Sequence, residues 1–126
     1  MNSATFSVRG IRPKPWGTKE WNWRRAIAAE AIKVQPSGNE NDPRQICVHL
    51  TFHLVTAVVG CADLDNLAKP VLDTLFHAKR VQTPEDGLSG VLFSCDDGHV
   101  YQLHLKKQSV SSETDEGIDA VIEWET

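Results

Sequence analysis

The pattern of hydrophobic and polar residues predicts four strands that each bury one face. Apolar and polar residues alternate over 5–9, 46–55, 100–107 and 119–124, and a period of two is typical of half-buried strands. A short apolar run at 91–93 indicates one extra strand. The predicted strands are therefore enough to form one sheet within this chain.

The same alternation assigns the two faces of the longer strands. In 46–55 the apolar side chains share one face and are expected to be buried: Ile46, Val48, Leu50, Phe52 and Leu54. His49 and His53 fall on the opposite face, where we expect solvent or an interface rather than a metal ion. In 100–107, Tyr101, Leu103 and Leu105 lie on one face and polar residues on the other, so we expect that strand also to have one buried side.

Two segments carry apolar residues at the three-and-four spacing of a helix with one buried stripe. The first covers about 19–33, with Thr18 as its N-cap, and its stripe is Trp23, Ile27, Ala28 and Ala31. The second follows Leu64, and its stripe is Leu67, Ala68, Val71, Leu72, Leu75 and Phe76. A proline inside a helix costs about 3 kcal/mol, so we expect the regular helix to begin one or two residues before Pro70.

The remaining segments read as connections. Pro and Gly punctuate 10–17, 35–44 and 80–90, and 108–117 is polar and acidic, as expected for a hairpin loop. The order is therefore β-α-β-α-β-β with one extra short strand. We predict an α+β fold in which two helices pack on a mixed sheet, within a single domain that spans residues 1–126.

Ionisable side chains concentrate at the start of the second helix. From Asp63 to Asp73 the chain carries three carboxylates, the amide of Asn66 and the ammonium of Lys69 within eleven residues. In extended backbone Asp63 and Asp65 point the same way, so their carboxylates converge. Two hard oxygen ligands suit Mg²⁺ or Mn²⁺. Lys69 follows Asp65 by one turn, where its ammonium would reach a phosphate held by that metal.

Each of these residues also has a plainer interpretation. Asp65 can serve as an N-cap, and Lys69 and Asp73 can form an exposed ion pair at i,i+4. Asp96 and Asp97 lie just before a predicted strand. They offer a third carboxylate for the metal, but Asp-Asp-Gly is also favourable turn chemistry.

The formal net charge of −4 is unevenly distributed. Residues 1–33 carry +5 and residues 34–126 carry −9. Tryptophans are interleaved with the cations of the basic third, a pattern that suits nucleic-acid binding. The candidate DNA-binding residues are Arg12, Lys14, Lys19, Arg24 and Arg25. Two alternatives stay open: the two parts of the chain neutralise each other, and the tryptophans belong to the core or to a dimer contact.

The cysteines and the hydropathy indicate a cytoplasmic protein. Cys47, Cys61 and Cys95 form an odd set without CxxC spacing, so we expect reduced thiols. No apolar run approaches the roughly 20 residues that span a bilayer, and the first residues lack the regions of a signal peptide. A weaker alternative is a zinc site drawn from Cys61, His77, Cys95 and His99, whose spacings match no compact zinc pattern.

Two motifs resemble the RusA family of Holliday junction resolvases. They are Asp63-Leu64-Asp65-Asn66-Leu67-Ala68-Lys69-Pro70-Val71-Leu72-Asp73, and Asp96-Asp97-Gly98-His99-Val100 running into a strand that ends in Lys106-Lys107. An N-terminal strand followed by a loop with Pro and Lys is similar to that family as well. The chain departs from the family in its longer segment 77–95, in Gly98-His99 and in its net acidity.

The resemblance implies a Mg²⁺-dependent, structure-specific endodeoxyribonuclease of phage type, a homodimer that resolves four-way junctions by paired symmetrical nicks in DNA recombination and repair. It makes Asp63, Asp65 and Asp97 the metal-binding catalytic aspartates and Lys69 the essential lysine, with Asn66, Asp73 and Asp96 in support. Asp86 is the alternative to Asp97. The alternatives for function are a RusA-like nucleic-acid-binding protein that does not cleave junctions, and a metal-dependent nuclease of other specificity.

Overall fold

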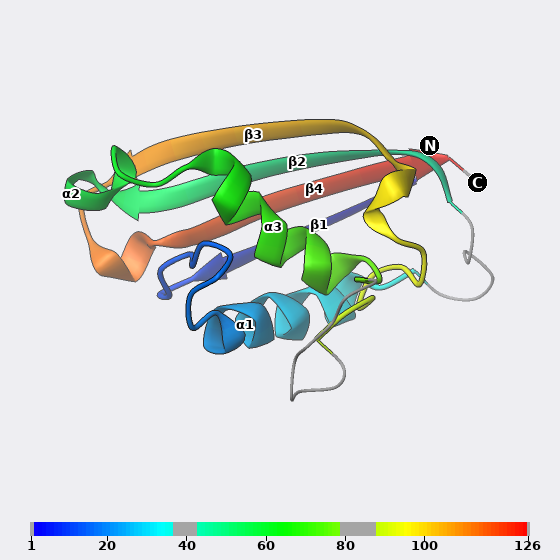
Figure 1. Ribbon diagram of the computed structural model, residues 1–126, viewed down its shortest axis with the longest axis horizontal. Coiled ribbons are helices and arrows are strands. Elements are labelled where there is room, and N and C mark those ends of the chain that lie inside the picture. Colours follow the sequence, from blue (N-terminus) through cyan, green and yellow to red (C-terminus); the bar gives the residue numbers. More distant parts are fainter. Residues whose placement is uncertain (1, 37–42, 79–87, 126) are drawn as a thin grey trace.

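The computed structural model describes residues 2–36, 43–78 and 88–125, and it contains a four-stranded sheet with helices packed on one face (Figure 1). The strands are β1 (Asn2–Arg9), β2 (Arg44–Val55), β3 (Val100–Val110) and β4 (Gly117–Glu125). The helices are α1 (Trp21–Ala31), α2 (Thr56–Val59) and α3 (Leu64–Leu75). The predicted α+β class with a mixed sheet is confirmed, and α2 is a short third helix that the sequence did not indicate.

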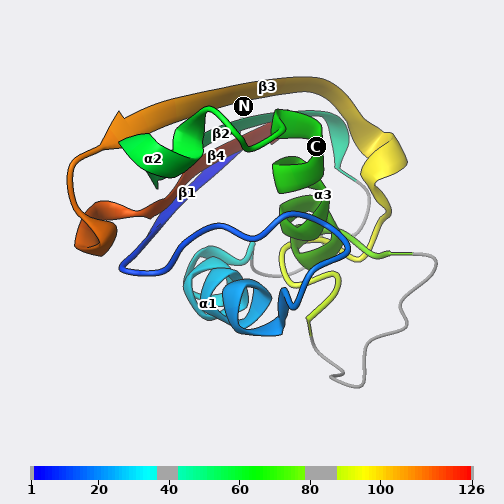
Figure 2. The ribbon, with the colours of Figure 1, turned by 60° about the vertical axis from the view of Figure 1, so that its left-hand side comes forward.

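The strands lie in the order β1-β4-β2-β3. β4 runs antiparallel to both β1 and β2, whereas β3 runs parallel to β2. The predicted hairpin over 108–117 is therefore wrong, because β4 inserts between β1 and β2 and does not pair with β3. A parallel pair needs a crossover connection, and the segment that contains α3 supplies it between β2 and β3 (Figure 2).

The core lies between the sheet and helices α1 and α3. The five apolar side chains of β2 that the alternation assigned to one face are all at most 1% exposed. The predicted stripe of α3 is buried throughout, and Trp23, Ile27 and Ala31 of α1 are fully buried. Burial of this apolar surface is the main favourable term in folding.

The predicted buried side of β3 is confirmed only at Leu105, which is half-buried against the core. Leu103 is 42% exposed although its pairing with Val48 puts it on the face that bears the helices, and Tyr101, at an irregularity in the register, is 71% exposed. β3 is an edge strand of the sheet (Figure 1). The period-two pattern gives the orientation of side chains but not whether a helix covers them.

Helix α3 begins six residues before Pro70, at Leu64, which corrects the predicted start. Pro70 has no N–H to donate to the carbonyl of Asn66 four residues earlier. The backbone N–H of Trp16 donates to that carbonyl at 2.9 Å instead. The loop after β1 thus satisfies the acceptor that the proline leaves open, and it holds Trp16 against the exposed face of α3.

Two other local predictions are corrected by hydrogen bonds. Residues 91–93 form no strand, because Val91 donates its backbone N–H to Thr74 and Leu92 to Leu75, which satisfies carbonyls at the end of α3. Helix α1 begins at Trp21, because the Thr18 hydroxyl donates to the carbonyl of Pro15 at 2.7 Å and does not cap the helix.

The face of the sheet without helices carries a polar cluster around Asp119 of β4. Ser7 and Arg9 donate to one carboxylate oxygen at 2.7 Å each, and His53 contacts the other at 2.8 Å. His53 lies on the face opposite the apolar side chains of β2, as predicted, but it is 8% exposed and packs in this cluster, so it does not face solvent. Burial alone would raise the pKa of Asp119, but the hydrogen bonds from these three partners and the charge of Arg9 outweigh it and lower the pKa below 3.8.

The lowered pKa of Asp119 predicts a pH-dependent contribution to stability. A carboxyl whose folded pKa is depressed stabilises the fold above its unfolded pKa, and that contribution is lost as the pH falls through the folded value. We expect Asp119→Asn to destabilise the protein at neutral pH, and the difference from wild type to shrink once the pH falls below 3.8. Urea unfolding of both proteins across this range measures it. A constant difference would contradict the prediction.

Candidate functional site

The exposed face of α3 presents the ionisable side chains of the first motif. Asp63 occupies the N-cap position in extended conformation without a side-chain capping bond, and Asp65 lies in the first turn. Asp63, Asp65 and Lys69 are exposed, whereas Asp73 is half-buried. The Lys69 ammonium lies 3.1 Å from an Asp73 carboxylate oxygen. The i,i+4 ion pair that the sequence offered as an alternative is therefore present.

The acidic pair lies near the other end of α3. The backbone N–H of His77, just after the helix, donates to the carbonyl of Cys95 at 2.9 Å. The Asp96 carboxylate accepts the N–H of Gly98 at 2.8 Å and caps a short 3₁₀ turn that leads into β3. The turn interpretation of Asp-Asp-Gly is confirmed. Asp97 lies in that turn and is exposed.

Two hollows lie along α3 and share Trp16 and Lys69. The larger has a volume of about 420 Å³, and its polar lining includes Lys69, Asp73, Asp96 and Asp97. The smaller has a volume of about 290 Å³ and is lined by Trp16, Asp65, Asn66 and Lys69. Lys69 thus borders both hollows. This arrangement places one ammonium beside Asp65 on one side and beside the acidic pair on the other.

The three proposed metal ligands do not form a compact group. In the described part of the chain, one set of three or more ligating side chains has its donor atoms within 4.8 Å of one another, and that set does not contain Asp63, Asp65 or Asp97. Asp97 lines the larger hollow and Asp65 the smaller. Asp65 and Asp73 are separated by eight residues of helix, which is about 12 Å at 1.5 Å per residue. Asp86, the alternative to Asp97, lies outside the described residues.

The compact set is Cys47, His49 and His104, on the face of the sheet without helices. From the sequence, His49 is expected to face solvent or an interface and Cys47 to be a reduced thiol, and no ligand role is predicted for either of them or for His104. The sequence could have indicated two of these three ligands, because alternation places Cys47 and His49 on one face of β2. His104 could not be found in this way, since it joins them only through the parallel pairing of β2 and β3. Cys61, His77, Cys95 and His99 provide no such group of three among the described residues.

Three of the five predicted DNA-binding residues, Arg12, Arg24 and Arg25, have partners within the protein; Arg25 donates to the Asn22 side chain at 2.9 Å. Arg24 is 4% exposed, so the expectation that it reaches outward is wrong. Its guanidinium donates to the Thr74 hydroxyl at 2.8 Å and to the backbone carbonyls of Asp73 and Leu88. Burial lowers the pKa of Arg24, and the charges of Asp73 and Glu20 partly offset this effect. Arg24 thus joins α1 to α3.

Arg12 also pairs within the protein. Its Nε lies 2.9 Å from a carboxylate oxygen of Glu116, which is 2% exposed. The hydrogen bond with Glu116 raises the pKa of Arg12 above its ordinary value. Lys14, Lys19 and Arg25 are exposed. Lys19 and Arg25 line a third hollow of about 350 Å³ at the start of α1, together with Trp21 and Asn22.

Comparison with known proteins identifies no relative from which a function could be carried over. No family model, curated protein or solved structure matches this chain. The chemical features of this chain that bear on function are therefore the two hollows, the lysine that borders both, and the Cys/His/His set. In the described ranges, no helix has both the length and the apolar character needed to cross a membrane.

Proposed function

We propose that this protein is a Mg²⁺-dependent, structure-specific endodeoxyribonuclease of RusA type, which resolves four-way DNA junctions by paired nicks. The observation that carries the proposal is the pair of adjoining hollows that share Lys69, with Asp65 at one and Asp96 and Asp97 at the other. Carboxylates around an ammonium are the side chains that phosphodiester hydrolysis with a divalent ion uses. The two sequence motifs of the family meet at this place in the fold.

The donors around the hollows fit Mg²⁺. This ion prefers oxygen ligands, keeps several of its waters and uses only one or two carboxylates together with substrate phosphates. A compact cage of three carboxylates is therefore not required of the free protein. We assign Asp63, Asp65 and Asp97 to hold one or two such ions, each bound by one or two of these carboxylates. A bound ion would supply an activated water and charge stabilisation at the scissile phosphate.

The side chains of the chain itself position the DNA. Lys69, now paired with Asp73 at 3.1 Å, exchanges that partner for the phosphate and offsets the charge that develops on it. Trp16 is 59% exposed at the rim of both hollows, where an aromatic ring can stack on an unpaired base at the branch point. Lys14, Lys19 and Arg25 contact the phosphates of the junction arms.

Paired symmetrical nicks require two active sites related by a two-fold axis. We assign the edge strand β3 to the contact with the second copy. An edge strand leaves one row of backbone N–H and C=O groups without a partner strand, which makes it a template for pairing. Tyr101 and Leu103 add exposed apolar surface beside that edge. The homodimer would form by extending the sheet across the two protomers.

Asp65→Asn tests the nuclease. We expect wild-type protein with Mg²⁺ to nick a synthetic four-way junction. The substitution should lower the rate by about 100-fold or more, because it removes one of the carboxylates assigned to hold the metal ion that stabilises charge on the scissile phosphate. Asp115→Asn is the matched control, since Asp115 is an exposed aspartate of the turn before β4. Equal rates for wild type and Asp65→Asn would contradict the mechanism.

The second candidate is a DNA-binding protein that does not cleave. It is favoured by the Lys69–Asp73 ion pair and by the separation of the three carboxylates in the described chain. It gives a different outcome in the same experiment: junction binding that is indifferent to Mg²⁺, and no nicking by wild-type protein. A nuclease of other specificity would cut other branched or duplex DNA and leave the junction intact.

A further inference from the structure

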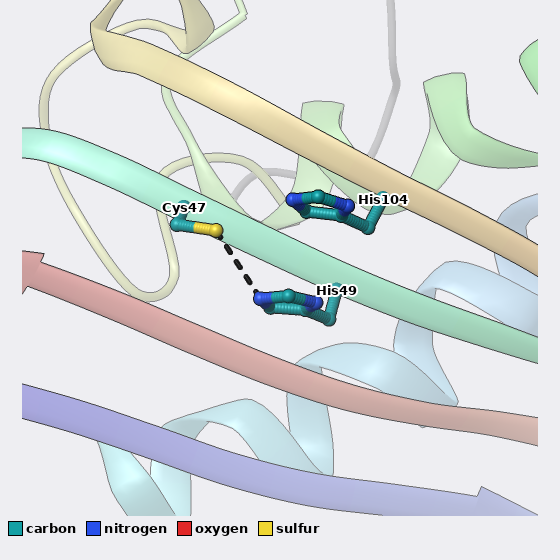
Figure 3. A group of neighbouring side chains, drawn as sticks. All are labelled: Cys47, His49 and His104. Atoms are coloured by element: carbon teal, nitrogen blue, oxygen red, sulfur yellow. Dashed lines mark hydrogen bonds between the residues drawn. The ribbon is translucent and has the colours of Figure 1, made fainter.

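The face of the sheet without helices carries a cluster of one thiol and two imidazole side chains, which have no role in the proposed nuclease activity. Cys47 and His49 extend from β2, and His104 extends from the neighbouring strand β3 (Figure 3). One donor atom from each lies within 4.8 Å of the other two. The Cys47 sulfur lies 3.2 Å from Nε2 of His49, and the imidazole rings of His49 and His104 stack with centroids 4.5 Å apart.

We propose that Cys47, His49 and His104 bind a Zn²⁺ ion, with Glu123 as the fourth ligand. Zinc takes four ligands in a tetrahedron and combines thiolate, imidazole and carboxylate donors. Glu123 of β4 lies opposite Cys47 in the sheet register. One of its carboxylate oxygens lies 3.3 Å from Nε2 of His49, the same nitrogen that faces the Cys47 sulfur. Two neighbouring strands thus bring three donors together, and β4 places the Glu123 carboxylate beside one of them, His49.

The distances require only small side-chain movements. Zn–S and Zn–N bonds of about 2.3 and 2.0 Å at a tetrahedral angle put sulfur and nitrogen roughly 3.5 Å apart. Cys47 and His49 already stand at about that separation. The two imidazole planes are nearly parallel, at 6°, so the rings must tilt toward a common point because nitrogen lone pairs lie in the ring plane. His104 is exposed on the edge strand, so its ring has room to turn from its stacked position on His49.

Other groups near the cluster support the assignment. The amide oxygen of Gln102 lies 3.4 Å from Nε2 of His104, so it accepts the Nε2–H and orients the ring when His104 binds the ion through Nδ1. The carboxylate of Glu123 adds an oxygen donor, which zinc accepts beside thiolate and imidazole. Binding replaces the thiol proton of Cys47, which passes to the solvent.

Cobalt substitution tests this site without any measurement of DNA cleavage. Co²⁺ titrated into the wild-type protein is expected to give a sulfur-to-cobalt charge-transfer band and the strong visible absorption of a tetrahedral ion, both saturating at one equivalent. Zn²⁺ should displace it. Cys47→Ser should abolish the charge-transfer band, and His104→Ala should weaken Zn²⁺ binding by at least about 100-fold, beyond the 10- to 100-fold typical of losing an outer partner.

Two controls separate this site from others in the chain. Cys61→Ser removes an exposed thiol elsewhere and should leave the cobalt spectrum and the Zn²⁺ affinity unchanged. Asp65→Asn should leave both unchanged as well, so failure of the nuclease would not affect this result. The proposal is overturned if wild-type protein gives no charge-transfer band, if the band survives Cys47→Ser, or if it is lost in Cys61→Ser. Circular dichroism of each variant establishes that it is folded.

Discussion

Replacing Gly117 by alanine is expected to destabilise the protein by about 4 kcal/mol, at the upper end of single substitutions. Gly117 begins β4 with φ +152°, a conformation that L side chains rarely adopt. A Cβ atom built there would lie 1.8 Å from the backbone carbonyl oxygen of Val8. That oxygen belongs to β1, which pairs with β4 through the sheet, so relief of the clash requires the two strands to separate. Urea unfolding followed by circular dichroism measures the loss.

Two other glycines provide graded controls for Gly117. Gly10 has φ +83°, and no atom lies within 4 Å of the position that a Cβ would take, so Gly10→Ala should lose only the backbone strain of about 1 to 2 kcal/mol. Gly60 has φ −75° and is equally open, so Gly60→Ala should be close to neutral. A loss at Gly117 no larger than the loss at Gly10 would show that the strands accommodate the methyl group.

The elements that the sequence predicted correctly are those that depend on local periodicity. The alternation of β2 and the helical stripe of α3 each repeat over enough residues to specify which side is buried. The start of α3 could not be predicted in the same way. It depends on the hydrogen bond from Trp16 to Asn66, which joins residues 50 positions apart and compensates for Pro70.

The same distinction between local periodicity and long-range contacts applies to the residues of the candidate site. The ionisable side chains around the hollows were identified from the motif spacing, because α3 carries Asp65, Asn66 and Lys69 on one exposed face. The place of Asp97 was not, since it depends on the backbone contact between His77 and Cys95. The Cys47, His49 and His104 cluster depends on the register of two parallel strands, which the order of elements does not determine.

Replacing Arg24 by methionine is expected to destabilise the protein by about 3 kcal/mol, because removal of one partner leaves buried polar groups without theirs. The Arg24 guanidinium lies 3.9 Å from the carboxylate of Glu20, and both side chains are less than a tenth exposed. The carbonyls of Asp73 and Leu88 and the hydroxyl of Thr74 also lose a donor. Methionine keeps most of the side-chain volume, so the loss measures polar interactions more than packing.

Arg25→Met is the matched control for Arg24→Met. Arg25 is the exposed neighbour on α1, so its replacement should change stability little.

The pH dependence of the Arg24→Met variant distinguishes a lost ion pair from general disruption. Burial raises the pKa of Glu20 above 4.5 in the wild type, and the hydrogen bond from Gly17 and the charge of Arg24 partly oppose it. Without Arg24 the pKa of Glu20 should rise further, because an opposing charge has been removed. A raised folded pKa makes the ionised form costly, so the deficit of the variant should shrink as the pH falls through that pKa and Glu20 becomes neutral. Glu20→Gln in the same background should remove this pH dependence. A deficit that stays constant with pH, or that persists unchanged with Glu20→Gln, would assign the stabilising effect of Arg24 to its contacts with α3 alone.

With either result, Arg24 fixes the α3 backbone at Asp73, which lines the larger hollow, from beneath the surface that the DNA would contact.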